Sequence, residues 1–287
     1  MLQDLSFGKL QNEFRNIGPV DQDVAICICE GSILLKRNAD DSLELPRIAA
    51  VRHWAEQESW RQWNSDAFQY VFRMQEENYF LWMGEAGGAD ESYHYENVRQ
   101  LRQLVSKEVC FAVLTAWHLY TWYRNNRFCG RCGAMTAHDS KERMLRCPDC
   151  GNMIFPRISP AVIVAVTDGD RLLLSKYAGR GYTRYALLAG YTEIGETIEQ
   201  TVHREVMEEV GLRVRNLRYY KSQPWGVDGN VLMGFFCDLD GTDEIHIDPT
   251  ELSFAQWYPR DELPAHDDGI SLTREMIRVL EEGNEPR

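Results

Sequence analysis

The sequence predicts an α+β protein made of three consecutive segments. Short apolar runs separated by turn residues predict β-hairpins near the start of the chain and again after residue 160, whereas longer stretches have helical periodicity. Between these regions, two C-x-x-C pairs mark a small module of their own. We therefore expect a mixed α/β domain over residues 1–124 that ends in a long helix, a cysteine module over 125–156 and a second mixed domain over 157–287.

Length and charge restrict the kind of protein further. At 287 residues, the chain has room for two domains and a small insert. No apolar run approaches the ~20 residues of a bilayer span, and the first ten residues lack the pattern of an export signal, so we expect a cytoplasmic protein without membrane contact. A net charge of −13 disfavours unspecific nucleic-acid binding through a basic surface.

The first hairpin is expected between the apolar runs Val24–Glu30 and Ile33–Arg37, because Gly31 and Ser32 between them are turn residues. Cys27 and Cys29 alternate on the first of these runs. They have no partner pair nearby in the sequence, so we interpret them as small buried apolar residues rather than metal ligands.

A long helix is expected from Asn97 to Arg124, where apolar residues recur at helical spacing without interruption by glycine or proline. Upstream, Trp54, Trp60 and Trp63 could form a surface on which a ligand stacks. No polar constellation accompanies them, and packing in a core or an interface is the better interpretation.

The cysteine module has the spacing of a tetrahedral zinc site. Cys129 and Cys132 form one C-x-x-C pair, Cys147 and Cys150 form the other, and 14 residues separate the pairs. Four thiolates leave no open coordination position, so the zinc should be structural rather than catalytic. Two disulfides or four free thiols are the alternative, which a reducing cytoplasm and the doubled C-x-x-C spacing disfavour.

A strand, a loop and a helix follow in the second domain and carry the most informative pattern. Residues from Tyr185 to Ala189 are expected to form a strand, and those from Thr197 to Val210 a helix that has an apolar stripe at four-residue steps. On this helix, Glu205, Glu208 and Glu209 fall near one face.

Three neighbouring carboxylates repel one another and favour bound cations. Hard oxygen ligands select Mg²⁺ or Mn²⁺, which keep positions open for water and substrate phosphates. Such a metal neutralises a diphosphate and activates a water. We expect Arg204 to pair with a carboxylate such as Glu196 and hold the loop against the helix, rather than contact phosphate. A merely solvated helix face would carry balancing lysines four residues away, which are missing here.

These residues match the Nudix box, G-x5-E-x7-R-E-U-x-E-E-x-G-U with U aliphatic, from Gly190 to Leu212. The segment is therefore similar to the Nudix hydrolase family. The resemblance implies an α/β/α sandwich around a mixed sheet, and hydrolysis of a nucleoside diphosphate linked to another group.

The zinc ribbon before the box and Ser222-Gln223-Pro224-Trp225 after it resemble the NADH pyrophosphatase (NAD⁺ diphosphatase) subfamily. The resemblance covers about residues 98–276. It implies hydrolysis of NADH or NAD⁺ to a nicotinamide mononucleotide and AMP, with Mg²⁺ or Mn²⁺ as catalytic metal and Zn²⁺ as structural metal. It also implies a homodimer, and RNA with a 5′ NAD cap is a further candidate substrate because the scissile bond is the same.

The resemblance also implies roles for individual residues. The catalytic metal would be held by Glu205, Glu209, Glu251 and the carbonyl of Ala189, with Glu208 as an extra ligand or the base. Arg99 would meet a phosphate or acidic group, Glu142 would accept from a ribose hydroxyl, and Phe155 and Tyr191 would stack on the bases. The complete expected substrate set is Arg99, Glu142, Phe155, Tyr191, Ser222, Gln223, Pro224, Trp225 and Thr273.

One segment departs from the subfamily pattern. Where the subfamily has S-Q-P-W-P-F-P-x-S, this chain has Ser222 to Val231 with two prolines lost, one residue gained and two glycines introduced. Substrate choice is therefore open, and a pyrophosphatase for ADP-ribose or another nucleoside-diphosphate derivative is the alternative. A non-catalytic ligand sensor or RNA-binding module is the alternative from another class, since a fold does not fix function.

Overall fold

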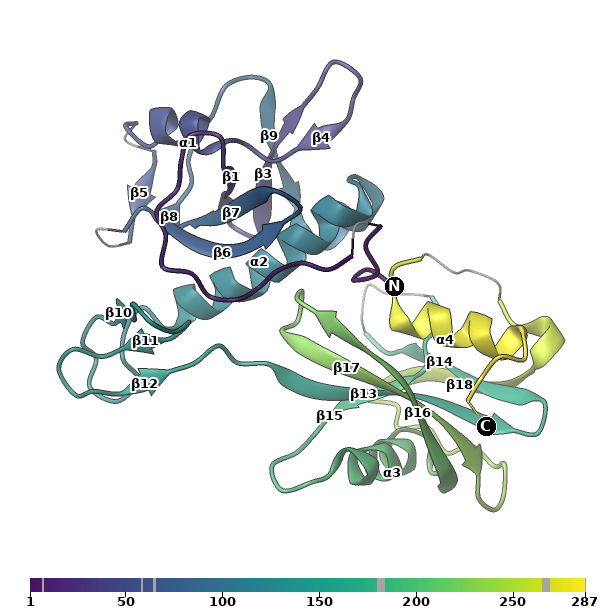
Figure 1. The fold of residues 1–287 in the computed structure, drawn as a ribbon. Helices are drawn as coiled ribbons and strands as arrows, with labels where there is room; N and C mark the ends of the chain where they lie inside the picture. The colour runs from purple at the N-terminus through teal and green to yellow at the C-terminus, as the bar shows by residue number, and fades with distance from the viewer. Residues whose placement is uncertain (7, 58, 64–65, 180–183, 265–268, 287) are drawn as a thin grey trace. The chain divides into compact units, whose positions relative to one another are not determined.

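The computed structural model describes residues 1–6, 8–57, 59–63, 66–179, 184–264 and 269–286. They form two compact units (Figure 1). The first unit contains Gln3–Arg157 together with the short segment Gly226–Gly229, and the second contains Met1–Leu2, Ile158–Trp225 and Asn230–Arg287. The cysteine module thus belongs to the same compact unit as the N-terminal segment.

The N-terminal part of the first unit consists of small sheets around one helix. Its elements are β1 (Val24–Ile26), β2 (Ile28–Cys29), β3 (Ser32–Arg37), β4 (Leu43–Glu44), α1 (Ile48–Trp54), β5 (Arg61–Gln62), β6 (Phe68–Met74), β7 (Glu77–Trp82), β8 (Gly84–Glu85) and β9 (Tyr93–Asn97). The strand orders are β1-β7-β6 and β2-β3-β4, with β9 on the free side of β3, and β5 pairs with β8.

The expected first hairpin forms only in part. β2 and β3 pair antiparallel through Ile28 and Ile33, as the turn at Gly31 requires. The run from Val24 to Glu30 is not one strand, however, because β1 pairs parallel with β7 in a different sheet. Cys27, at the crossing between the two sheets, is fully buried in the core. Its interpretation as a small buried apolar residue is confirmed.

Aromatic side chains dominate this core. Trp54 and Trp60 stack with ring centroids 6.0 Å apart, and Trp60 meets the edge of Trp82 at 5.4 Å. Both Trp54 and Trp60 are buried, so their expected packing role is confirmed. Trp63 differs, because it is half-buried and packs on Tyr120 instead.

The expected continuous helix from Asn97 to Arg124 is wrong in its first third. Val98–Gln103 forms a 3₁₀ helix, η1, and the α-helix α2 begins only at Lys107 and ends at Asn125. The side chain of Asn97 accepts from the backbone N–H of Arg99, and Ser106 accepts from that of Val109. Each polar side chain caps a helix start, so two short-range caps outweigh the continuous apolar period.

The cysteine module follows α2 as three two-residue strands, β10 (Ala137–His138), β11 (Leu145–Arg146) and β12 (Met153–Ile154), paired antiparallel in this order. Arg143 joins the module to the N-terminal part of the unit. Its guanidinium donates to the carbonyl oxygen of Val71 at 2.6 Å and to that of Asn12 at 3.1 Å.

The second unit contains one six-stranded mixed sheet. Its elements are β13 (Ser159–Asp168), β14 (Arg171–Tyr177), β15 (Leu188–Tyr191), α3 (Ile198–Val210), β16 (Val214–Trp225), β17 (Asn230–Leu239), β18 (Leu252–Pro259), η2 (Arg260–Glu262) and α4 (Leu272–Glu281). The strand order is β16-β17-β13-β14-β18, and β15 pairs with part of β13. β13 and β17 run parallel, whereas the other pairs are antiparallel.

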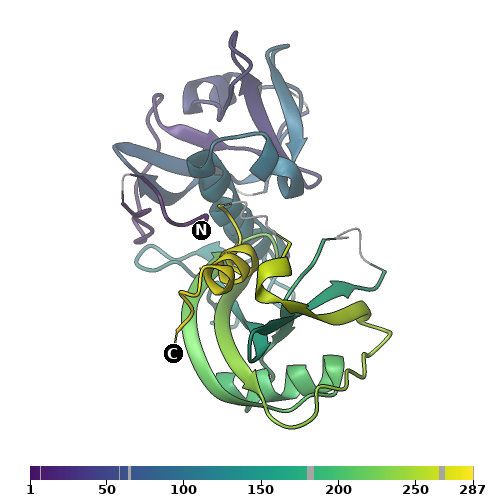
Figure 2. The ribbon, with the colours of Figure 1, turned by 90° about the vertical axis from the view of Figure 1, so that its right-hand side faces the viewer.

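The two helices α3 and α4 cover opposite faces of this sheet (Figures 1 and 2). Successive residues of β13 point to alternate faces, so Val162 and Val164 pack with α3 whereas Ile163 and Ala165 pack with α4. The expected α/β/α sandwich around a mixed sheet is therefore confirmed. Among the described residues, no helix is long and apolar enough to span a membrane.

Candidate active site and cysteine site

Helix α3 begins and ends where the sequence expects it. The side chain of Thr197 accepts from the backbone N–H of Gln200, whose side chain accepts in turn from that of Thr197, which completes a capping box. Gly211 ends the helix with a φ of 70°, a conformation that costs glycine nothing. Val202 and Val206 anchor the helix on the sheet, so the positions of the glutamates between them are fixed.

Arg204 connects the loop before α3 with the helix itself. Its Nε and Nη2 donate to the two carboxylate oxygens of Glu196 at 2.6 and 3.0 Å, so the expected pair is confirmed. Nη1 donates to Glu205 at 2.7 Å and to Glu208 at 2.8 Å, and Nη2 also donates to the carbonyl of Tyr191. The hydrogen bond from Arg204 lowers the pKa of Glu196 to about 2.

Glu205 lies directly against strand β15. A methyl group on Gly190 would sit 1.9 Å from the carboxylate carbon of Glu205, so only glycine allows this approach. Burial raises the pKa of Glu205, in opposition to the lowering effect of Arg204, and the charges of Glu208 and Glu251 raise it further.

The loop before β18 closes against the end of α3. The backbone N–H of Asp248 donates to the carbonyl of Glu209 at 3.0 Å, and the N–H of Ala178 donates to the carbonyl of Glu251 at 2.8 Å. Glu209 is 1% exposed, and Glu251 is exposed. These backbone contacts hold Glu251 close enough to Glu205 for their charges to interact.

The expected metal-ligand set thus comes from one region of the second unit. Ala189 pairs with Ile163 on β13 and directly precedes Gly190. Glu208 is the outermost of the three helix carboxylates, with a side chain 59% exposed. The glutamate oxygens are not gathered tightly, because within the described ranges only the cysteine group brings three or more candidate ligand atoms within 4.8 Å of one another.

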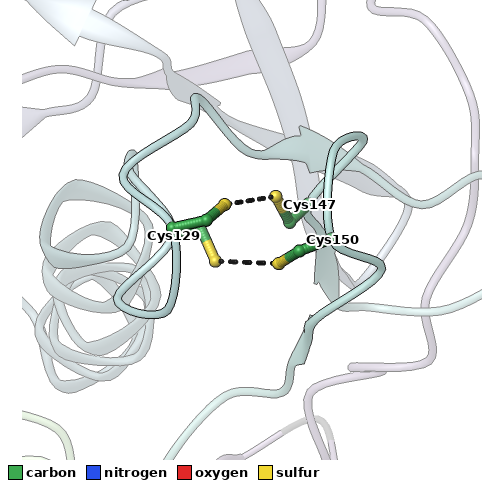
Figure 3. A group of neighbouring side chains, drawn as sticks. Cys129, Cys147 and Cys150 are labelled. Carbon is green, nitrogen blue, oxygen red and sulfur yellow. Dashed lines mark hydrogen bonds between the residues drawn. The ribbon is translucent and has the colours of Figure 1, made fainter.

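The four cysteines of the module come together, and Figure 3 shows Cys129 facing Cys147 and Cys150. All four sulfur atoms lie within 4.8 Å of one another, with Sγ–Sγ distances of 3.6 Å for Cys129 and Cys150 and 3.4 Å for Cys132 and Cys147. None of the four forms a disulfide. The backbone N–H of Arg131 donates to Cys129 and lowers the pKa of this thiol to about 6, which favours the thiolate that zinc requires.

The two aromatic residues that are expected to stack on substrate bases are exposed to solvent. Phe155 is 53% and Tyr191 50% exposed, and the hydroxyl of Tyr191 donates to Asn230 at 3.1 Å. Glu142 is exposed in the loop between β10 and β11, and Thr273 lies half-buried on α4.

The segment Ser222–Trp225 forms the end of β16 and pairs with β17 from Met233 to Asn230. Gln223 is fully buried, and its amide bridges to the start of α4. It donates to the carbonyl of Ile270 at 2.7 Å and accepts from the N–H of Leu272 at 2.8 Å. These two hydrogen bonds give Gln223 a structural role in addition to the expected substrate contact.

The departure from the subfamily pattern has a structural reason that the sequence reasoning missed. A methyl group on Gly226 would lie 2.0 Å from the carbonyl oxygen of Leu114 in α2, so the backbone here packs directly on the helix. Trp117 donates from Nε1 to the carbonyl of Val227 at 3.3 Å, and Arg99 pairs with Asp228 at 3.2 Å. The glycines after Trp225 could have signalled such a close approach.

Comparisons with known proteins agree with this geometry. The protein-family model for the NUDIX domain matches residues 157–280, and the model for the NADH pyrophosphatase zinc ribbon domain matches residues 124–155. The NAD-capped RNA hydrolase NudC of Enterobacter sp. (strain 638) is 36% identical over 198 residues, which is 68% of this chain and 76% of the relative. The enzyme of the same name from Pectobacterium atrosepticum is 38% identical over 183 residues, 63% of this chain and 70% of the relative.

Among solved structures, a NUDIX hydrolase from Nitrosomonas europaea is 24% identical with a TM-score of 0.48, covering 54% of this chain and 91% of that one. The two matched regions coincide with the glutamate helix and the cysteine site. Because the first relative shares more than a third of its aligned residues over about three quarters of its length, the chain belongs to the Nudix hydrolase family.

Proposed function

We propose that this chain is an NAD⁺/NADH diphosphatase. It hydrolyses the pyrophosphate bond of the dinucleotide to a nicotinamide mononucleotide and AMP, and it removes NAD caps from RNA by the same reaction. The main observation in support of this reaction is the position of Glu205. Because Gly190 has no side chain, the buried carboxylate of Glu205 lies directly against the backbone of β15. The ribbon and the two relatives named for NAD-capped RNA support the substrate.

The residues fit a divalent cation. Glu205 and Glu209 are buried carboxylates, and a buried negative charge is costly unless a cation compensates it. Arg204 supplies only part of this compensation, since burial still raises the pKa of Glu205. Glu205, Glu209, Glu251 and the carbonyl of Ala189 would hold Mg²⁺ or Mn²⁺, which neutralises the diphosphate and activates a water for attack on phosphorus.

The surrounding residues prepare this arrangement. Arg204 fixes Glu196, Glu205 and the carbonyl of Tyr191 in one hydrogen-bonded group, so the carboxylates are oriented before substrate arrives. Glu208 is exposed enough to accept a proton from water or to serve as an additional ligand.

The proposed substrate contacts lie on both sides of the box in sequence. The open rings of Tyr191 and Phe155 offer flat faces for adenine and nicotinamide. Arg99 offers a cation for a phosphate, and Glu142 offers an acceptor for a ribose hydroxyl.

The central test replaces Glu209 by glutamine, which keeps the size of the side chain and removes its charge. We expect Glu209→Gln to lower kcat with NADH in Mg²⁺ by about a hundredfold or more. The far-ultraviolet circular dichroism spectrum should stay unchanged, which shows that the variant is folded. Glu199→Gln is the matched control, because Glu199 is exposed in the first turn of the same helix. Full activity of a folded Glu209→Gln protein would refute the site.

A substrate panel tests the choice of dinucleotide. We expect kcat/KM in Mg²⁺ or Mn²⁺ to be higher for NADH and NAD⁺ than for ADP-ribose, and NMN to be released from NAD-capped RNA. Equal or faster turnover of ADP-ribose would replace this proposal by an ADP-ribose pyrophosphatase.

The family resemblance also supports a homodimer in the cytoplasm. Light scattering of the purified protein should give twice the chain mass of 33.3 kDa. A monomer that retains full activity with NADH would contradict the homodimer that the subfamily resemblance implies.

A further inference from the structure

The cysteine module is basic although the whole chain is acidic. Residues 125–156 carry five basic side chains (Arg127, Arg131, Lys141, Arg143 and Arg146) and three acidic ones (Asp139, Glu142 and Asp149). The remaining chain has 26 of the 31 Lys and Arg residues but 41 of the 44 Asp and Glu residues. Arg143 donates to two backbone carbonyls and Arg146 pairs with Asp139, so Arg127, Arg131 and Lys141 are the cations of the module that remain to attract an anion.

A row of stacked side chains leads to the surface of this module. The rings of Trp117 and Tyr120 lie 6.0 Å apart, and those of Tyr120 and Trp63 lie 5.4 Å apart. The guanidinium carbon of Arg127 follows, 5.2 Å from the ring centre of Trp63 and 5.7 Å from that of Phe128. Arg127 is thus in cation–π contact with both rings, and Phe128 ends the row.

Phe128 is exposed to solvent although its backbone is paired. The residue is 55% exposed, and its backbone forms a β-bridge with Met135. The next residue, Cys129, is part of the cysteine site, so any metal bound there fixes the position of Phe128. A shallow hollow lined by Arg127, Met135 and His138 lies in the same region.

We propose that Phe128 is a stacking platform for a nucleobase of single-stranded RNA. This inference rests on the proposed activity on NAD-capped RNA and deepens it, because it assigns a site to the nucleotides that follow the cap. Single-stranded RNA is recognised by aromatic rings on which unpaired bases stack, next to cations that contact its phosphates. Phe128 supplies the ring, and the cations are Arg127, 5.7 Å from the centre of that ring, and exposed Arg131, three residues further along the chain.

The positive charge next to Phe128 favours RNA over an apolar protein surface as the molecule that binds there. An apolar surface on another copy of this chain would gain from Phe128 but not from Arg127 and Arg131, because apolar contact leaves their charges unpaired. A polyanion gains from both.

The direct test measures the affinity of a fluorescent oligoadenylate for the zinc-loaded, full-length protein by anisotropy at low salt. This probe has no cap, so its binding does not depend on hydrolysis. We expect Phe128→Ala to weaken binding by about tenfold and Phe128→Tyr to bind like the unaltered protein, since the tyrosine ring can also stack. Met153→Ala is the matched control, because Met153 is 53% exposed on the same module but pairs with Arg146 on a different strand edge.

The second measurement compares two substrates. Phe128→Ala should lower kcat/KM for NAD-capped RNA by a similar factor and leave kcat/KM for NADH unchanged. Unchanged oligoadenylate affinity in Phe128→Ala, equal losses in Met153→Ala, or a change of oligomeric state in Phe128→Ala would overturn the platform. If the unaltered protein lacks diphosphatase activity, the proposed function fails while the binding experiment still decides the platform.

Discussion

At the scale of single residues, Gly190 sets how close the carboxylate helix comes to the sheet. The position that its side chain would take is filled by the carboxylate of Glu205. Gly190 lies within strand β15, paired with Val162. The glycine is therefore required by the space available and not by a left-handed backbone.

Gly190→Ala should reduce activity without unfolding the protein. The added methyl group must displace Glu205 or the start of β15, and a shift of about 1 Å in a catalytic group costs on the order of a hundredfold in rate. We expect such a loss in kcat/KM for NADH, while the far-ultraviolet circular dichroism spectrum stays unchanged. Gly88→Ala is the control, since nothing lies within 4 Å of its added methyl group. Normal kinetics in Gly190→Ala would show that Glu205 can move freely.

Glu275 on α4 makes the second unit sensitive to acid. Burial alone would raise its pKa, but hydrogen bonds from Lys221 and Tyr220 outweigh burial and lower the pKa to about 2. Because the folded-state pKa lies below the ordinary value of 4.5, ionised Glu275 stabilises the fold above about pH 4.5. This contribution is lost as the pH falls towards 2.

Replacing the carboxylate should therefore flatten the acid dependence of stability. We expect the free energy of unfolding in urea to fall less between about pH 5 and about pH 2.5 in Glu275→Gln than in the unaltered protein. Glu281→Gln, at the exposed end of the same helix, should behave like the unaltered protein. Equal acid sensitivity in both variants would contradict the assigned role of Glu275.

At the scale of elements, sequence motifs correctly predicted those helices and strands whose ends are fixed by contacts within the same segment. The box helix is correct to within one residue, because its capping box, apolar stripe and terminal Gly211 all lie inside the segment. The expected helix before the module failed at Ser106, whose side chain caps a new helix start. The first apolar run also failed, since only tertiary pairing decides that β1 joins β7.

The tip between β16 and β17 provides an element-scale prediction. Asp228 holds the guanidinium of Arg99, which is 70% exposed and is proposed to meet a substrate phosphate. A surface ion pair contributes only about 0–1 kcal/mol, so a phosphate can displace Asp228. Asp228→Asn should therefore lower KM for NADH by about twofold to fivefold.

A double-mutant cycle checks this mechanism. In the Arg99→Gln background, Asp228→Asn should leave KM unchanged, because no guanidinium remains to be released. The same reduction of KM in both backgrounds would show that Asp228 repels the substrate directly.

At the scale of the whole molecule, the cysteine module is part of the N-terminal unit and not an independent linker. Arg143 gives a physical reason, because its Nη2 donates to the carbonyl groups of Val71 and Asn12, which lie far away in the sequence. The loss of zinc should therefore loosen more than the module itself.

Removal of zinc tests this connection. The purified protein should contain about one zinc per chain, and Cys147→Ser should contain none. Limited proteolysis of the zinc-free protein is expected to cleave within residues 3–157 and to leave residues 158–287 protected. A zinc-free protein that resists proteolysis throughout would show that the cysteine site contributes little to the fold.

The sequence predicted the part of the candidate site whose residues follow one another closely along the chain. Residues 190–212 form the box and fold together, so their spacing already indicates which side chains meet. The contact of Arg127 with Trp63 and that of Gly226 with Leu114 join distant segments. No periodicity or motif spans such separations, so these contacts appear only in three dimensions.

The contact at Gly226 limits how this enzyme can be re-engineered. A proline in place of Gly226, as in the loop of the subfamily, would put a ring carbon 2.0 Å from the carbonyl oxygen of Leu114, which is far inside van der Waals contact. A chimaera that exchanges the loop alone should consequently misfold locally. Loop and helix α2 would therefore have to be exchanged together, as one cassette.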